Sequence, residues 1–189
     1  MKTVKSIHFC RYEIKKSIFI SYVVPISEFK AFHIKLKTEH PKAAHIVWAC
    51  RHINEFGQII ENSSDDGEPK GTSAQPTLNV LRGIEAVDIS VLTVRYFGGI
   101  KLGTGGLSRA YGTAAKMALA QANLILYEKK EDFCFTCKYP FVQKIEYFLN
   151  KIGVDFKNRD FKIDDVVWML EVSSQQKDEI KRFLSDNFI

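Results

Sequence analysis

The pattern of apolar and polar residues predicts strands and a helix in the first third of the chain. Residues 12–24 alternate in the manner of extended segments, with isoleucine, tyrosine and valine recurring at every second position. Ser27 is predicted to cap the start of a helix that runs to about Glu39. Residues 45–53 are rich in strand-forming side chains, and residues 58–60 are predicted to pair with them across a short turn.

The next segment contains the strongest patterns in the sequence. Apolar residues between Pro76 and Leu81 predict a helix that ends at the helix breaker Gly83. Residues 89–94 form a short apolar run, which predicts a buried strand. The alanine-rich stretch 106–122 predicts a closely packed helix, because alanine combines high helix propensity with a small side chain.

A charged stretch without periodicity, residues 124–132, predicts a boundary between two domains, residues 1–127 and residues 128–189. In the second domain the patterns predict a strand, a helix, two strands and a helix. These elements cover residues 133–139, 141–151, 153–159 and 166–172, with the last helix running from Ser173 or Ser174 to about Leu184. The order is similar to that of a ferredoxin-like module without a clear final strand.

Composition and charge are those of an ordinary globular chain. Of the 189 residues, 46% are hydrophobic and 26% are charged. No stretch approaches the roughly 20 apolar residues that span a bilayer, and the first residues lack the apolar centre of a signal peptide. We therefore expect a cytoplasmic protein with no membrane partner. The formal net charge of +5 is concentrated in residues 1–125, which favours a polyanionic partner, although many proteins that bind no nucleic acid are equally basic.

Four cysteines raise the question of metal or redox chemistry. Without an export signal, reduced thiols are expected rather than disulfides. Cys134 and Cys137 have the spacing of redox and zinc motifs, but residues three apart on the predicted strand point to opposite faces. No second Cys/His pair lies nearby in the sequence to complete four ligands. We therefore expect the cysteines to pack structurally, without a structural metal.

A glycine-rich loop between the buried strand and the alanine-rich helix is the strongest candidate for a binding site. It contains Gly98, Gly99, Gly103, Gly105 and Gly106. Such a loop exposes unpaired backbone N–H groups at the positive end of the helix dipole, and Arg95, Lys101 and Arg109 add positive charge. This combination predicts a site for the phosphate of a nucleotide or nucleic acid. The spacing matches neither a P-loop nor a dinucleotide-binding motif, and the alternative is that the glycines serve tight turns and close packing.

An acidic turn precedes this loop in the sequence. Its carboxylates, Asp65, Asp66 and Glu68, fall within four residues, a pattern that suits Mg²⁺ binding, a helix cap or ion pairs with Arg95 or Arg109. A solvated or salt-bridged turn is the more frequent role of so small a cluster.

Two residues of the strand 45–53, His45 and Arg51, are predicted neighbours of this site. Histidine within a strand is more often structural than catalytic. No serine or histidine lies in the context of a nucleophile elbow, so no catalytic residue is assigned and enzymatic activity is left open.

Four stretches of the first domain match the motifs of a known family. They are residues 13–20, 44–45, 65–72 and, most specifically, 94–112. On these motifs the chain resembles the IMPACT/YigZ family, and the remainder looks like the small C-terminal domain of bacterial members. One departure is Ser73-Ala74, where the family usually has Ala-Gly, so that a flexible backbone position is lost.

The resemblance implies an α+β fold. The first domain would be like domain 2 of ribosomal protein S5, and the second like the ferredoxin-like last domain of elongation factor G. Both folds recur in translation factors, and eukaryotic relatives regulate translation by binding the activator of a stress kinase. The resemblance therefore favours a translation-associated binding protein that contacts RNA, the ribosome or a protein partner through the basic glycine-rich loop. We expect no cofactor.

Two alternatives remain at this point. The first is a nucleotide- or phosphate-dependent enzyme, because the S5-like fold also houses small-molecule kinases with glycine-rich phosphate loops. The second is a regulatory module that interacts with proteins alone.

Overall fold

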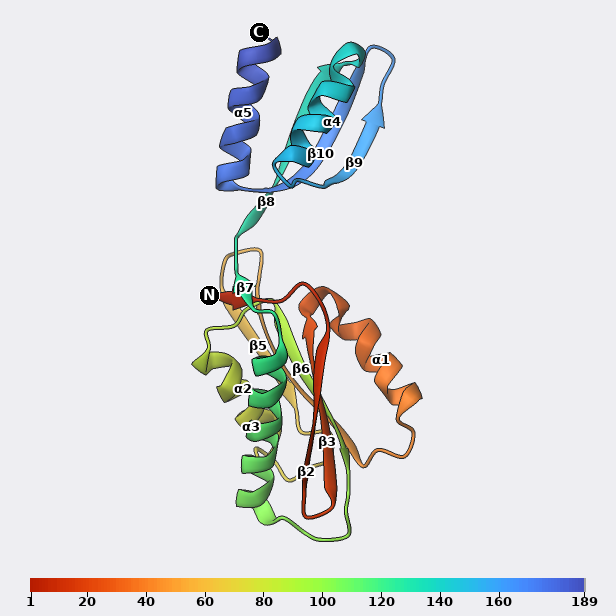
Figure 1. Ribbon diagram of the computed structural model, residues 1–189, viewed down its shortest axis with the longest axis vertical. Helices are drawn as coiled ribbons and strands as arrows, with labels where there is room; N and C mark the ends of the chain where they lie inside the picture. The colour runs from red at the N-terminus through yellow and green to blue at the C-terminus, as the bar shows by residue number, and fades with distance from the viewer. Residues whose placement is uncertain (189) are drawn as a thin grey trace. The chain divides into compact units, whose positions relative to one another are not determined.

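A five-stranded antiparallel sheet forms the centre of the first of two units (Figure 1). The computed structural model describes residues 1–188, and the chain divides into the units Met1–Tyr127 and Glu128–Ile189. The strands of the sheet, in spatial order, are β2 (His8–Ile14), β3 (Ser17–Pro25), β6 (Ile89–Tyr96), β4 (His45–Ile53) and β5 (Ile59–Ser64). A short pair, β1 (Lys2–Thr3) with β7 (Ile125–Leu126), joins the two ends of this unit.

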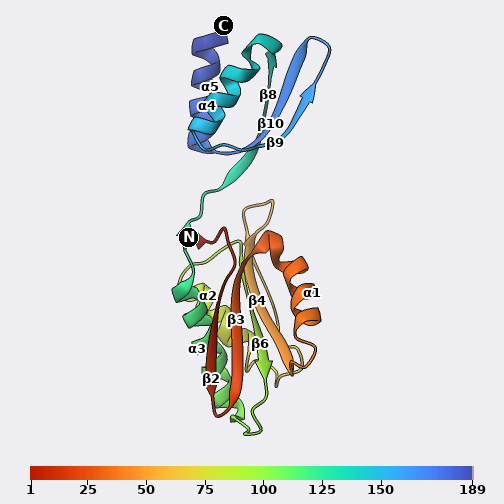
Figure 2. The same cartoon turned by 45° about the vertical axis from the view of Figure 1, so that its right-hand side comes forward.

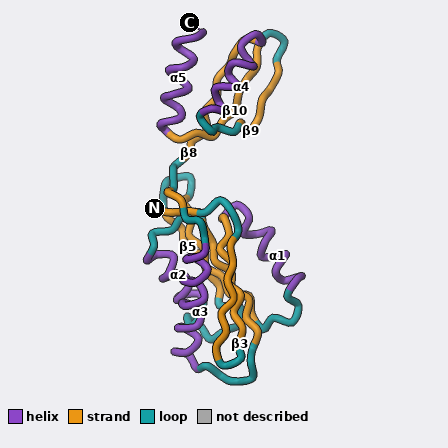
Figure 3. Tube along the Cα trace, viewed as in Figure 1, coloured by secondary structure: helices purple, strands orange, loops and turns teal. Residues whose placement is uncertain are grey.

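Helices cover both faces of the sheet. The helix α1 (Phe29–Glu39) lies on one face, while α2 (Ala74–Gly83) and α3 (Gly103–Gln121) lie on the other (Figures 1 and 2). Figure 3 shows the same layers as helices on either side of the strands. The order is therefore helix, sheet, helix.

Two predicted helix starts differ from the structure. The prediction that Ser27 caps α1 is wrong, because Ile26–Glu28 form a 3₁₀ turn and Glu28 precedes the helix without a side-chain cap. The helix α3 begins at Gly103 rather than at residue 106, so the last glycines of the loop form its first turn. Both errors lie at element ends, where sequence patterns are weakest.

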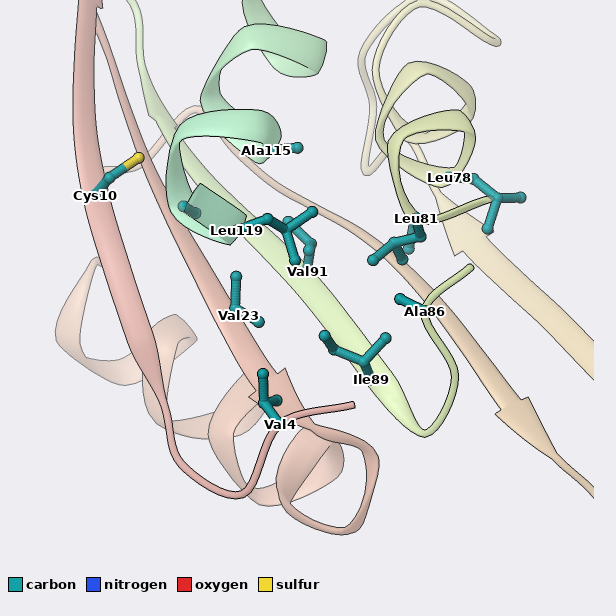
Figure 4. Packing of buried hydrophobic residues seen from close by; sticks show 12 residues of the cluster. Val4, Cys10, Val23, Leu78, Leu81, Ala86, Ile89, Val91, Ala115 and Leu119 are labelled. Atoms are coloured by element: carbon teal, nitrogen blue, oxygen red, sulfur yellow. The ribbon is translucent and has the colours of Figure 1, made fainter. Parts of the chain in front are cut away.

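Apolar side chains fill the space on each side of the sheet. Val23 and Val91 from the sheet contact a layer with Leu81 of α2 and Leu119 of α3 (Figure 4). A second cluster on the side of α1 includes the fully buried Leu36. Because both faces are covered, every residue from position 89 to 95 in β6 is buried, which explains why the apolar run at 89–94 does not alternate.

The second unit is smaller and contains a three-stranded antiparallel sheet. Its strands, in spatial order, are β8 (Lys130–Lys138), β10 (Asp165–Ser173) and β9 (Phe156–Phe161). The helices are α4 (Val142–Lys151), which follows the 3₁₀ turn Tyr139–Phe141, and α5 (Ser174–Phe188). The predicted order of strand, helix, two strands and helix is confirmed.

The core of this unit settles the orientation of the two neighbouring cysteines. Trp168 is fully buried, and its indole N–H donates a hydrogen bond to Cys137 Sγ at 3.2 Å. Cys137 is therefore buried, whereas Cys134 is exposed. The prediction that the two thiols lie on opposite faces of a strand is confirmed.

Across residues 1–188, no helix is long and apolar enough to cross a membrane.

Candidate functional site

The acidic turn (residues 65–68) and the glycine loop (residues 98–106) border one pocket of about 540 Å³. Its remaining wall comes from the end of β6 and the start of β4. The pocket is lined by polar, charged and aromatic side chains and by an apolar surround. The first group comprises His45, Glu68, Arg95, Phe97, Lys101 and Thr104, and the surround includes Pro69, Leu102, Gly103 and Leu107. Two loops that are separated by some thirty residues of sequence therefore meet in space. We call this cavity the glycine-loop pocket.

A buried ion pair forms part of the pocket wall. Glu68 Oε1 accepts a hydrogen bond from the Arg95 guanidinium at 2.5 Å and a second from the Tyr111 hydroxyl at 2.7 Å. The side chains of Glu68 and Arg95 are 3% and 7% exposed. Burial, with the adjacent Glu68 carboxylate, raises the pKa of Tyr111 far above its ordinary value, so the hydroxyl remains a donor.

Arg95 has more hydrogen-bonding capacity than the protein satisfies. Its guanidinium lies over the rings of Phe19 and Phe97, at 5.6 and 5.7 Å from the ring centroids. A guanidinium offers five N–H donors. Within residues 1–188 its one hydrogen-bond partner is Glu68, and its Nε is buried without any. The pocket is thus bordered by a cation with unused donors.

His45 stands at the edge of the same pocket, at the first position of β4. Its Nδ1 lies 2.7 Å from the carbonyl oxygen of Asp66, and because a carbonyl oxygen accepts, Nδ1 carries the proton. The other ring nitrogen, Nε2, lies 3.9 Å from Glu68 Oε2. A neutral His45 therefore presents an acceptor at Nε2, and a protonated one pairs with Glu68.

The other two carboxylates of the acidic turn stabilise backbone. Asp65 accepts hydrogen bonds from the N–H groups of Gly71, Ser73 and Ala74, so it caps the start of α2. Burial alone would raise the pKa of Asp65, but these bonds and the Ser73 hydroxyl at 2.5 Å outweigh it and lower the pKa below its ordinary value. Asp66 Oδ2 accepts from the N–H of Ile46 at 2.5 Å. The three carboxylates thus serve three separate partners.

The contact of Ser73 with Asp65 gives a role to the departure noted in the sequence. Ser73 contributes a hydroxyl that joins the cap of α2. The neighbouring Ala74 is the first residue of α2 and is buried. Alanine at position 74 is therefore compatible with a well-formed helix start.

The glycines of the loop have different roles. A Cβ on Gly98 would lie 2.0 Å from the carbonyl carbon of Lys16, so the loop packs directly on the turn between β2 and β3. Gly103 takes a positive φ of 71° at the start of α3. Gly105 and Gly106 form the first helical turn, and Gly99 lies exposed in the loop.

The N-terminus of α3 is open. The residue before it, Leu102, provides no side-chain cap, and the first turn contains no acidic residue. The first N–H groups of a helix have no partner inside it. This end of α3 lies at the pocket through Gly103 and Thr104, and there it presents donors and the positive end of the helix dipole.

Two predicted neighbours lie outside the pocket. Arg51 donates to Glu61 at 2.9 Å and to the carbonyl oxygen of Ala86 at 2.9 Å. It lies six positions after His45 on an extended strand, roughly 20 Å away at about 3.3 Å per residue, so the prediction that it faces the site is wrong. Arg109 lines a separate groove between α2 and α3, and its guanidinium lies beside Gly105.

Phe97 and Tyr111 belong to the site although neither was predicted from the sequence. Phe97 follows Arg95 by two residues and therefore had a signal, since alternate residues of an extended segment share a face. The sequence signal for Tyr111 was weaker. Tyr111 lies four residues after Leu107, so both side chains occupy the core face of α3. In the described chain, no group of three or more His, Cys, Asp or Glu side chains is arranged to hold a metal ion.

The fold and the pocket together define a two-unit α+β protein with a glycine-loop site in its first unit. Residues 15–119 match the model of the Impact N-terminal domain, and the chain belongs to the IMPACT family. An IMPACT family member of Haemophilus influenzae is 37% identical over 153 residues, which cover 79% of this chain and 74% of that protein. The IMPACT family member YigZ of Escherichia coli is 36% identical over 155 residues, with coverage of 79% and 75%.

A solved structure supports the arrangement of elements along almost the whole chain. A crystal structure described as that of a hypothetical protein aligns with a TM-score of 0.70 and 30% sequence identity. The alignment covers 98% of this chain and 91% of that one.

Proposed function

We propose that this chain is a translation-associated binding protein that contacts RNA through the glycine-loop pocket. Family membership supports the link to translation, because the family resemblance implies regulators of translation. The same resemblance leads us to assign the first unit to the S5 domain 2-like fold and the second to the ferredoxin-like fold. The strand order β8-β10-β9, with α4 and α5 as its two helices, supports the second assignment.

The observation that carries the proposal is an exposed aromatic ring among cationic groups and open helix donors. Phe97 is 51% exposed and borders the pocket together with Lys101 and the start of α3. Aromatic rings stack on the bases of single-stranded RNA, and lysine and helix N-termini hold phosphates. The pocket combines the two kinds of contact that unpaired RNA requires.

The roles of the acidic turn weigh against the enzymatic alternative. A phosphoryl-transfer site uses carboxylates to hold Mg²⁺ beside the phosphates. Here Asp65 caps α2, Asp66 accepts from the backbone of β4, and Glu68 is paired with Arg95. Because all three carboxylates already have partners within the protein, the site resembles a binding site more than a kinase-like site.

Fluorescence anisotropy with a labelled single-stranded RNA at about 50 and 200 mM salt tests the proposal. Lys101→Ala is compared with Lys116→Ala, which removes the same charge from an exposed position on α3 that lies outside the pocket. Phe97→Ala is compared with Phe56→Ala, since Phe56 is 78% exposed between β4 and β5. We expect a several-fold loss of affinity for the two pocket variants and a small one for the controls.

Two outcomes would contradict the proposal. Absence of RNA binding at both salt concentrations would exclude it and direct attention to protein partners. Saturable binding of ATP with Mg²⁺, lost in Lys101→Ala, would instead support the nucleotide-dependent enzyme.

A further inference from the structure

The unused donors of Arg95 indicate what part of an RNA the pocket receives. Its side chain is more than nine-tenths buried, lines the pocket and makes one hydrogen bond through a group with five donors. A buried polar group without a partner is costly, so its presence in a native protein calls for an explanation, and a bound ion is one of them. The planar fork of arginine matches the oxygens of a phosphate in two parallel hydrogen bonds.

A second source of positive potential lies on the same pocket. Lys101 and the open N-terminus of α3 border it from the glycine loop. Among the described residues that line the pocket, Glu68 is the one carboxylate, and it is already engaged by Arg95 and Tyr111. Arg95 and Glu68 cancel in charge, so Lys101 and the helix dipole leave the pocket with a net positive charge of about one and a half. A positive site attracts a doubly charged anion more strongly than a singly charged one.

The size and walls of the pocket suit a single nucleotide. A volume of about 540 Å³ falls in the range of small-ligand sites, about 300–1,000 Å³. Apolar side chains such as Pro69, Leu102 and Leu107 line it, and Phe97 adds an exposed ring. A base fits against these walls while its phosphate lies toward Arg95 and α3.

The charge of the phosphate separates the end of an RNA strand from its interior. An internal phosphodiester carries one negative charge, whereas a terminal phosphomonoester carries close to two at neutral pH, as it does on a phosphorylated side chain. Charge therefore favours a terminal phosphomonoester over an internal phosphodiester.

We propose that the glycine-loop pocket binds the terminal nucleotide of an RNA that ends in a phosphomonoester. Arg95 and the N–H groups of α3 hold the phosphate, and Phe97 contacts the base. This inference rests on the proposed RNA-binding function and specifies the part of the RNA that is recognised. A 5′ phosphate and a 3′ phosphate present the same chemistry, and the test separates them.

The test measures anisotropy with one internally labelled RNA sequence in four forms: 5′-phosphate, 3′-phosphate, both ends hydroxyl, and circular. We expect one phosphorylated form to bind at least 5-fold more tightly than the hydroxyl and circular forms. Free nucleoside monophosphate should compete with it. Equal affinity for all four forms would overturn the inference and leave the proposed RNA binding standing, whereas no binding of any form would remove both.

A variant at Thr104 separates recognition of the phosphate from effects on folding. Thr104 is exposed in the first turn of α3, where a negative charge favours the helix but repels an anion in the pocket. Thr104→Glu should keep or raise the melting temperature and abolish the preference for the phosphorylated end. Thr104→Gln, which has similar size and no charge, should retain most of it. A preference that survives Thr104→Glu would overturn the placement of the phosphate at α3.

Arg95→Lys tests the guanidinium itself while keeping its charge. We expect the preference for the phosphorylated end, measured as the ratio of the affinities for the phosphorylated and hydroxyl forms, to fall at least 3-fold. An unchanged preference in a folded Arg95→Lys protein would exclude Arg95 as a phosphate ligand.

Discussion

Glu68 and Arg95 lie 27 positions apart in the sequence and form a buried ion pair with an oxygen–nitrogen distance of 2.5 Å. Glu68 belongs to the acidic turn and Arg95 to the end of β6. The same carboxylate oxygen accepts a hydrogen bond from Tyr111 of α3. One carboxylate therefore joins the turn, the sheet and the helix that together form the pocket.

Removal of one partner of this pair should destabilise the protein strongly. Arg95→Ala leaves the Glu68 carboxylate buried without its cation, and such losses cost about 3–5 kcal/mol. Urea denaturation measures the change in the free energy of unfolding. Lys101→Ala, an exposed cation of the same pocket, should change it by no more than about 0.5 kcal/mol. Equal effects of the two substitutions would contradict a stabilising role for the pair.

Asp65 should contribute stability that depends on pH. Asp65→Ala removes the cap of α2 and should cost about 1–2 kcal/mol at pH 7. Because the pKa of Asp65 is lowered in the folded state, its contribution is present above the ordinary value of 3.8 and is lost as the pH falls below it. Denaturation of wild type and variant from pH 7 to 2 should therefore show a difference that shrinks in acid. Asp164→Ala, at an exposed carboxylate of the second unit, serves as the control.

Gly98 should tolerate no side chain. Gly98→Ala places a Cβ within 2.0 Å of the Lys16 backbone, and relief requires movement of the β2–β3 turn, at a cost of about 3 kcal/mol. Gly83→Ala is the matched control, since nothing lies within 4 Å of its added Cβ. Thermal unfolding should show a large fall for the first substitution and little change for the second. A Gly98→Ala protein as stable as wild type would refute the close contact.

One thiol of the four should react quickly in the native protein. Cys134 is exposed, whereas burial raises the pKa of Cys10, Cys50 and Cys137 and lowers their thiolate fraction. Labelling with a thiol-reactive disulfide reagent should give one fast equivalent, which disappears in Cys134→Ser. Two fast equivalents that both map to β8 would contradict the orientation of Cys137.

Elements with a strong compositional signal could be predicted from the sequence. The apolar run at 89–94 identified β6, because burial on both faces leaves few polar positions. The alanine-rich stretch identified α3, because alanine favours helix and allows close packing. The start of α1 could not, since Ser27 resembles a helix cap but lies within a 3₁₀ turn. Local propensity does not distinguish these two geometries.

The pocket was predictable in its parts but not in its assembly. The glycine loop and the acidic turn each have a recognisable composition, whereas the contact of Glu68 with Arg95 depends on strand order, which a single sequence does not specify. Arg51 and His45 lie on the same strand, β4, but the extended residues between them carry Arg51 away from the pocket. Arg109 and Tyr111 lie two residues apart, about 200° around α3, so one lines the outer groove and the other is buried.

The position of β6 also constrains the order in which the first unit assembles. It lies between two hairpins, β2–β3 and β4–β5, that are both synthesised before it. Hairpins close quickly because their contacts are local, whereas β6 pairs with strands far earlier in the chain. The two hairpins therefore remain separate until residues 89–96 join them, and the pocket completes only once α3 has followed. During synthesis, the glycine-loop pocket is therefore among the last parts of this unit to form.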